Sequence, residues 1–211
     1  MKKNFKTIKR INMKTINILT IILLALLFSC SPQVMNNGEN LNFGIFEVHK
    51  AKDIAAHVIE SIKANHVQLG SDGNSAVIGY ISESDTSVLL LDFSKENIKL
   101  VKTFYATDSD NKNYALIAIK PNAVINISDI KKTKATGNNI EITFTPNGAV
   151  KWATITKNNA ENEVAFVINN QIYSMPRLYG EIKEGIAYIS GLENKSVAKE
   201  ISESLNAIIA D

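Results

Sequence analysis

The sequence has few of the residues from which redox, disulfide and metal sites are built. Its 211 residues include one cysteine, one tryptophan, four prolines and three histidines. A single cysteine excludes a disulfide within the chain, so packing must hold the core together. The histidines, His49, His57 and His66, lack the i, i+4 spacing of a helical zinc pair. Neither a metal site nor a disulfide framework is therefore expected.

Complete ligand-binding and catalytic motifs are also missing. "DSDNKN", residues 108–113, opens like a calcium loop, but Lys112 and Asn113 stand where that loop needs an oxygen ligand and a glycine. "GSDGN", residues 70–74, lacks the lysine and hydroxyl residue of a phosphate loop. No Gly-x-Ser-x-Gly nucleophile motif occurs. We therefore expect polar turns at both loops, no cofactor and no enzyme activity.

No run of about 20 apolar residues, the length that spans a membrane as a helix, occurs in the chain. The longest apolar run covers residues 16–28, and six basic residues but no acidic residue precede Cys30. A basic flank before a short apolar core is typical of a secretory signal, and Met13 would begin a complete signal of its own. Without those six charges the formal net charge changes from +2 to −4, so nothing indicates nucleic-acid binding.

The end of this run, Leu27-Phe28-Ser29-Cys30, resembles a bacterial lipoprotein box. The resemblance implies that residues 1–29 are a signal peptide, that Cys30 is the lipid attachment site, and that residues 30–42 form a tether. Two or three acyl chains would then hold the protein stably on a membrane of the cell envelope, facing the periplasm. Ser31 leaves the inner and the outer membrane both open. In the alternative interpretation, Cys30 is simply the last residue of an apolar anchor.

The rest of the chain predicts an α+β fold, an antiparallel sheet with helices packed on one face. Strands are expected at residues 43–49, 76–81, 114–119, 139–144 and 185–190, where apolar residues alternate or run together. Asp53, Thr145 and Asn194 are candidate helix N-caps, with Pro146 at a first helical position. In the helix after Asn194, apolar residues at positions 197, 201, 205 and 208 predict one apolar stripe. Asp85 is expected to cap a short buried helix or strand in "TSVLLLDF". A domain boundary is expected near residue 120.

One stretch, "VAFVINNQIYSMPRLYGEI" (residues 164–182), reads as a hairpin. An apolar strand meets an Asn-Asn turn, and Met175-Pro176 ends the second strand. Tyr173, Met175 and Tyr179 could form an adhesive face, or they could simply cover the sheet. Trp152 is expected in the core.

Residues from about 125 to 209 resemble the head subdomain of the first periplasmic loop of the SecD and SecDF proteins. The resemblance is carried in order by "INISDIKKTKA", "ITFTPNGAVKWATITKNN", the hairpin above, and "GIAYISGLENKSVAKEISESLNA". Residues 43–120 resemble the base of the same loop more weakly, so residues 121–211 are expected to be head-like and residues 43–120 base-like. No membrane helix follows the signal, so the family's proton path is not expected here.

The resemblance implies a non-catalytic module, linked to protein export, that binds secreted polypeptide or Sec translocon subunits. On this hypothesis Tyr173, Met175, Pro176 and Leu178 form the polypeptide-binding surface, and charged residues at positions 173 and 178 should abolish binding without unfolding the protein. The alternative is an adaptor lipoprotein that docks one fixed envelope partner. An enzyme would need a convergent polar pocket, which no sequence pattern predicts.

Overall fold

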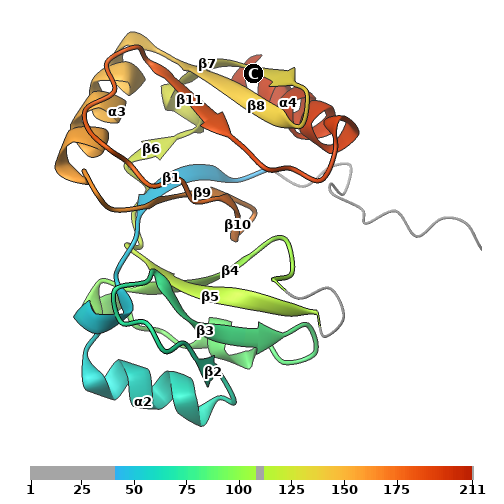
Figure 1. Ribbon diagram of the computed structural model, residues 1–211. Helices are drawn as coiled ribbons and strands as arrows, with labels where there is room; N and C mark the ends of the chain where they lie inside the picture. The colour runs from blue at the N-terminus through green and yellow to red at the C-terminus, as the bar shows by residue number, and fades with distance from the viewer. Residues whose placement is uncertain (1–40, 108–111, 211) are drawn as a thin grey trace, which may run out of the picture. The chain divides into compact units, whose positions relative to one another are not determined.

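A computed structural model describes residues 41–107 and 112–210 (Figure 1), and confirms the predicted α+β class. In chain order the main elements are β1 (Phe43–Glu47), α2 (Ala56–Ala64), β2 (Gln68–Leu69), β3 (Val77–Ser82), β4 (Lys99–Thr103), β5 (Asn113–Ile119), β6 (Ile125–Asn126), β7 (Ile130–Thr136), β8 (Asn139–Phe144), α3 (Pro146–Asn158), β9 (Val164–Ile168), β10 (Gln171–Ser174), β11 (Ile186–Ile189) and α4 (Lys195–Ala210). Four short 3₁₀ turns join them: η1 (Ala51–Asp53), η2 (Ser87–Leu90), η3 (Ser94–Glu96) and η4 (Ile127–Asp129).

The strands form two sheets rather than the single sheet expected. The larger has eight strands in the order β2-β3-β5-β4-β10-β9-β1-β6. All its neighbours are antiparallel except β4 and β10, which pair in parallel through Lys102 and Gln171. This pair joins the strands drawn in green in Figure 1 to the hairpin of β9 and β10. The sheet is therefore continuous across the boundary expected near residue 120.

The smaller sheet has three strands in the order β11-β8-β7, and α4 packs against it. The predicted apolar stripe of α4 is confirmed, because Val197, Ile201 and Leu205 are buried. Trp152 of α3 lies between the sheets, with its ring 5.6 Å from Phe144 on β8 and 6.1 Å from Phe166 on β9, measured between centroids. The expected core position of Trp152 is thus confirmed.

Strand β5 has both faces buried, which explains its unbroken apolar run. Leu116 and Ala118 belong to the cluster beneath α2, together with Val58 and Ile62. Ile117 and Ile119 point the other way, into a second cluster that includes residues of β9 and β10.

Several local predictions are confirmed to the residue. Strand β8 has the expected bounds, and the Thr145 hydroxyl accepts from the N–H of Gly148 at 3.1 Å to cap α3. A side chain at position 148 would overlap the carbonyl oxygen of Asp129, so only glycine allows this approach. Asn169 and Asn170 both have positive φ, as a tight hairpin turn requires. Asn194 caps α4 by accepting from Ser196 and Val197.

Two local predictions are wrong. Asp53 does not cap α2, because the helix begins at Ala56 after Ala55, which makes no side-chain cap. The stretch after Asp85 forms a single 3₁₀ turn rather than a buried helix or strand, and within that turn only Val88 is buried. The expected cap is present, because the Asp85 carboxylate accepts from the N–H of Ser87 at 3.3 Å. Four consecutive apolar residues cannot all face one side of such a turn, and Leu90 is 87% exposed. The prediction also missed β4 and β7, because lysines interrupt the apolar pattern of both strands.

Candidate functional site

Two of the four residues predicted to form a binding surface, Tyr173 and Leu178, are buried. Tyr173 is only 7% exposed, and its ring stacks on Phe104 with centroids 4.2 Å apart. Burial raises the pKa of the Tyr173 phenol well above its usual range. Leu178 is 3% exposed, and Met175 and Pro176 are half-buried. A charge at position 173 or 178 would therefore enter the core, so we expect such variants to be destabilised rather than to keep the fold intact.

Leu178 also holds its own segment in place through its backbone. Its N–H donates to the carbonyl oxygen of Asn162 at 2.9 Å, and its carbonyl oxygen accepts from the backbone N–H of Glu161 at 2.7 Å. Further along, the N–H of Ile182 donates to the hydroxyl of Thr156 on α3 at 2.9 Å. Residues 176–182 are thus attached on one side to α3 and the loop that follows it.

A groove opens on the other side of this segment, between it and β11, and we call it the β11 slot. It encloses about 570 Å³. Tyr179 and Tyr188 are its most accessible aromatic residues, 79% and 49% exposed. Its walls are mainly apolar and consist of Pro176, Arg177, Leu178, Tyr179, Gly180, Glu181, Ile182, Ile186, Ala187, Tyr188 and Ser190. Two of the four predicted residues, Pro176 and Leu178, line the slot, whereas Tyr173 and Met175 do not.

The β11 edge that faces the slot has unpaired backbone groups. Among the described strands, β11 pairs with β8 alone, and the N–H of Phe144 donates to the carbonyl oxygen of Gly185 at 3.0 Å. Bonded and non-bonded pairs alternate in an antiparallel ladder, so Ala187 and Ile189 direct their backbone groups toward β8. Ile186 and Tyr188 must direct theirs away from β8, toward the slot.

The opposite edge of the same sheet, on β7, is covered at Thr133. The side-chain amide of Asn206 on α4 accepts from the N–H of Thr133 at 2.8 Å and donates to its carbonyl oxygen at 2.9 Å. The hydroxyl of Thr133 bonds Ser202 in addition. Three exposed lysines, Lys131, Lys132 and Lys134, flank Thr133 on β7. Lysines and satisfied backbone groups both discourage strand pairing at an edge.

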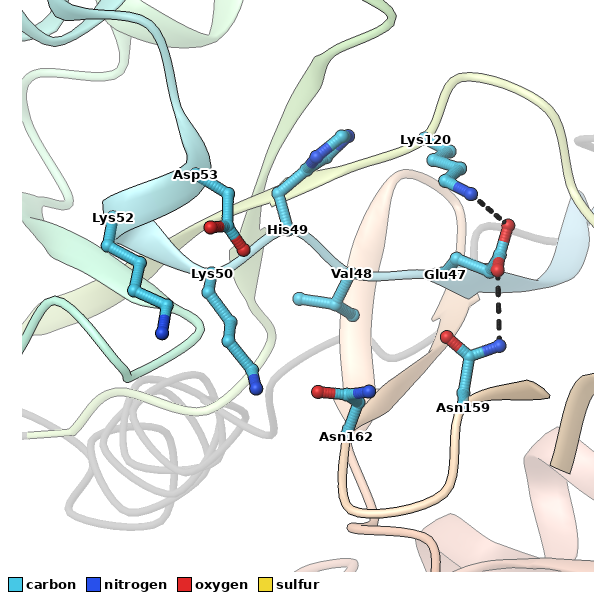
Figure 2. A pocket seen from close by; sticks show the side chains of 9 residues that line it. All are labelled: Glu47, Val48, His49, Lys50, Lys52, Asp53, Lys120, Asn159 and Asn162. Carbon is cyan, nitrogen blue, oxygen red and sulfur yellow. Dashed lines mark hydrogen bonds and ion pairs between the residues drawn. The ribbon is translucent and has the colours of Figure 1, made fainter. Parts of the chain in front are cut away.

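A second hollow, of about 450 Å³, is polar (Figure 2). The Lys120 ammonium lies 2.6 Å from a carboxylate oxygen of Glu47, and the Asn159 amide donates to the other oxygen at 3.1 Å. Burial opposes ionisation of Glu47, yet these hydrogen bonds outweigh it and hold the pKa of the carboxyl below its usual range. Glu47 is therefore a paired carboxylate anion. It connects β1 to Lys120, which follows β5, and to Asn159, which follows α3. Such an anion is unsuited to proton transfer at neutral pH.

The histidines are dispersed, as the sequence predicted. His49 lies 3.1 Å from the carbonyl oxygen of Asn97, His57 lies 3.2 Å from Glu96, and His66 lies 3.4 Å from Asp85. Within residues 41–107 and 112–210, no group of three or more histidine, cysteine or acidic side chains could hold a metal ion. No helix in the same residues is long and apolar enough to cross a membrane. Cys30 and the signal lie outside the described residues.

The sequence contained a signal for the open edge that the prediction did not use. "GIAYIS" was expected to be a strand, and its alternation already separates Ala187 and Ile189 from Ile186 and Tyr188. Which strand would pair with β11, and on which side, could not be read from that alternation.

Comparisons with known proteins agree on one family. The family model "SecDF, P1 head subdomain" matches residues 102–208. The protein translocase subunit SecDF of Thermus thermophilus is 35% identical over 63 residues, which are 30% of this chain and 9% of that protein. This chain therefore matches only a small part of that relative's length.

Solved SecDF structures are also similar, at 17% identity. One, of "a membrane component SecDF that enhances protein export", aligns with 96% of this chain and 71% of its own at a TM-score of 0.47. Another, of SecDF in a super-membrane-facing form, aligns with 92% of this chain and 33% of its own at a TM-score of 0.42. The family model alone covers just over half of the sequence, and the chain belongs to the SecDF P1 head subdomain family.

Proposed function

We propose that this chain is a non-catalytic, polypeptide-binding module of the bacterial cell envelope, linked to protein export, and that it binds polypeptide in the β11 slot. The observation that carries the proposal is the unpaired edge of β11 beside apolar walls. The relative in Thermus thermophilus is named a protein translocase subunit, and that context extends to this chain only as part of the proposal.

The chemistry of the slot suits a polypeptide of varied sequence. Backbone N–H and C=O groups at Ile186 and Tyr188 can pair with the backbone of any extended chain, so these bonds need no particular side chain. Apolar side chains such as Ile182 and Tyr179 can then add contact area in proportion to what they bury. A module that binds many different secreted chains needs backbone hydrogen bonds that any sequence can make, together with only a weak preference for particular side chains.

Anchoring to a membrane belongs to the same proposal. A lipid on Cys30 would hold the domain at a membrane facing the periplasm. The tether, residues 30–42, would let the domain lie a few nanometres at most from that membrane. The partners would be the membrane through Cys30, and either secreted polypeptides or Sec translocon subunits through the slot.

Photo-crosslinking in living cells tests the binding role. A photoreactive residue replaces Tyr188 at the slot, and a matched control replaces Leu90, which is more exposed but lies on η2. Many secreted chains, or translocon subunits, trapped at position 188 only would support the proposal. A single discrete partner at position 188 would favour the adaptor alternative. Equal trapping at both positions would contradict a role for the slot.

A further inference from the structure

We infer that Tyr179 is a movable clamp: residues 179–181 form a short flap, hinged at Gly180, that closes the Tyr179 ring over polypeptide bound in the β11 slot. This inference rests on the proposed function. It adds the residue that retains the bound polypeptide and the order of events, in which binding comes first and closure follows.

The flap lies between two fixed points of the slot wall. On one side Leu178 is buried, and both its N–H and its carbonyl oxygen bond to the loop after α3. On the other side the N–H of Ile182 donates to the Thr156 hydroxyl at 2.9 Å. Between these points, residues 179–181 make no backbone hydrogen bond to any residue that the structure describes. The flap can therefore move while its two ends stay in place.

Gly180 supplies the hinge. The chain bends at this residue, and its φ of +158° is one that residues with a side chain rarely adopt. A methyl group added there would have no heavy atom within 4 Å beyond its chain neighbours, so backbone conformation rather than crowding requires the glycine. Because nothing packs against this bend, its dihedral angles can change without breaking a contact.

The two exposed tyrosines of the slot differ in how they are held. Tyr188 lies on β11, which pairs with β8, and its hydroxyl donates to Glu141 at 3.1 Å. Tyr179 is more exposed, and it makes neither a hydrogen bond nor an aromatic contact within residues 41–107 and 112–210. Tyr188 is thus the fixed side of the clamp, and Tyr179 is the side that moves.

Apolar polypeptide in the slot would drive the closure. A ring that closes over a bound apolar side chain removes apolar surface of both partners from water, and a tyrosine can do so while its hydroxyl stays solvated. Charge is not needed for this contact. The two charged residues that line the slot are each paired outside it, Arg177 with Glu161 at 3.1 Å and Glu181 with Lys183 at 3.5 Å.

Stopped-flow fluorescence of the full-length chain in detergent tests the clamp, with Tyr179→Trp as the reporter and iodide as the quencher. The native Trp152 is buried, so iodide reaches mainly the introduced tryptophan. The probe is a neutral peptide, Ser-Thr-Val-Phe-Val-Thr-Ser. We expect it to reduce quenching at position 179 by about half, at a rate that levels off as peptide concentration rises, because closure follows binding. Leu90→Trp on η2 is the control and should show no change.

Two glycine variants locate the hinge. Gly180→Ala and Gly137→Ala each place a side chain on a positive φ with no neighbour within 4 Å, but Gly137 lies in the turn between β7 and β8. Gly180→Ala should raise the dissociation rate of the peptide about fivefold, whereas Gly137→Ala should leave it within about twofold of the parent rate. Thermal unfolding by circular dichroism checks that both variants fold.

The outcomes separate the clamp from the proposed function, because anisotropy of a labelled peptide measures binding independently. Peptide that binds without protecting position 179, or at a rate that rises linearly with concentration throughout, would overturn the clamp and leave the proposed function intact. Equal dissociation rates for the two glycine variants would do the same. Peptide that does not bind at all would overturn the clamp together with the binding role of the slot.

Discussion

The two edge strands of the smaller sheet differ in how their backbone groups are used. On β7 the Asn206 side chain of α4 bonds both backbone groups of Thr133, and lysines occupy three of the four exposed positions. On β11 the corresponding groups of Ile186 and Tyr188 face a slot with apolar walls. An unprotected edge invites pairing with other chains, which proteins usually prevent. On our proposal β11 is left open for binding. Three sets of changes test this contrast, and a fourth, at Glu47, serves as a reference outside the slot.

The largest effect is expected where the wall of the slot belongs to the core. Leu178→Glu would bury a carboxylate without a cation, and we expect a loss of at least ~3 kcal/mol in the free energy of unfolding. Leu90→Glu is the matched control, because that leucine is exposed, and it should change stability by less than ~0.5 kcal/mol. Urea denaturation measures both. A folded, stable Leu178→Glu protein would show that the wall is not part of the core.

Proline substitutions along β11 test which backbone groups face the slot. Ala187→Pro would remove an N–H bonded to β8 and should destabilise the protein by about 3 kcal/mol. Tyr188→Pro would remove only an outward N–H, so its stability should lie within ~1 kcal/mol of Tyr188→Ala. Similar losses for both prolines would contradict the alternation on which the open edge depends. Thermal unfolding of the three variants decides between these outcomes.

The covered edge can be opened by a single change. Asn206→Ala leaves the N–H and C=O of Thr133 without their side-chain partner, at a cost of about 2 kcal/mol. Ser204→Ala on the same helix is the control. We also expect the Asn206 variant to self-associate at high concentration, measured by light scattering, because a second strand edge becomes available. A monomeric variant of unchanged stability would mean that Asn206 does not protect this edge.

The smallest effect concerns Glu47, which lies outside the slot. Its pKa is lower in the folded chain than in the unfolded chain, so its contribution is complete above its ordinary pKa of 4.5 and is lost as pH falls through the folded value. Glu47→Gln should cost about 1 kcal/mol or less at pH 7, and the difference in stability from the parent chain should shrink as pH falls below 4.5. Peptide binding at pH 7 should not change. A difference in stability that is constant with pH would show that the Lys120 pair contributes nothing.

Sequence patterns succeeded where the structure is decided within a few neighbouring residues. The cap at Thr145, the Asn169-Asn170 turn and the stripe on α4 all follow from local hydrogen bonding and helical periodicity. The sequence did not reveal that Tyr173 and Leu178 are buried, and both were assigned to a binding surface. Their burial depends on Phe104 and Asn162, residues that reach them only through tertiary packing.

The primary structure alone therefore established the α+β class, the approximate bounds of several strands, and a resemblance to one family, because each depends on local periodicity and residue type. Two outcomes needed the tertiary structure. One is the division into two sheets joined by the parallel pair of β4 and β10. The other is the difference between the edges of the smaller sheet. Both depend on which distant segments meet, since an edge is open only if no other part of the chain, such as Asn206, bonds to it.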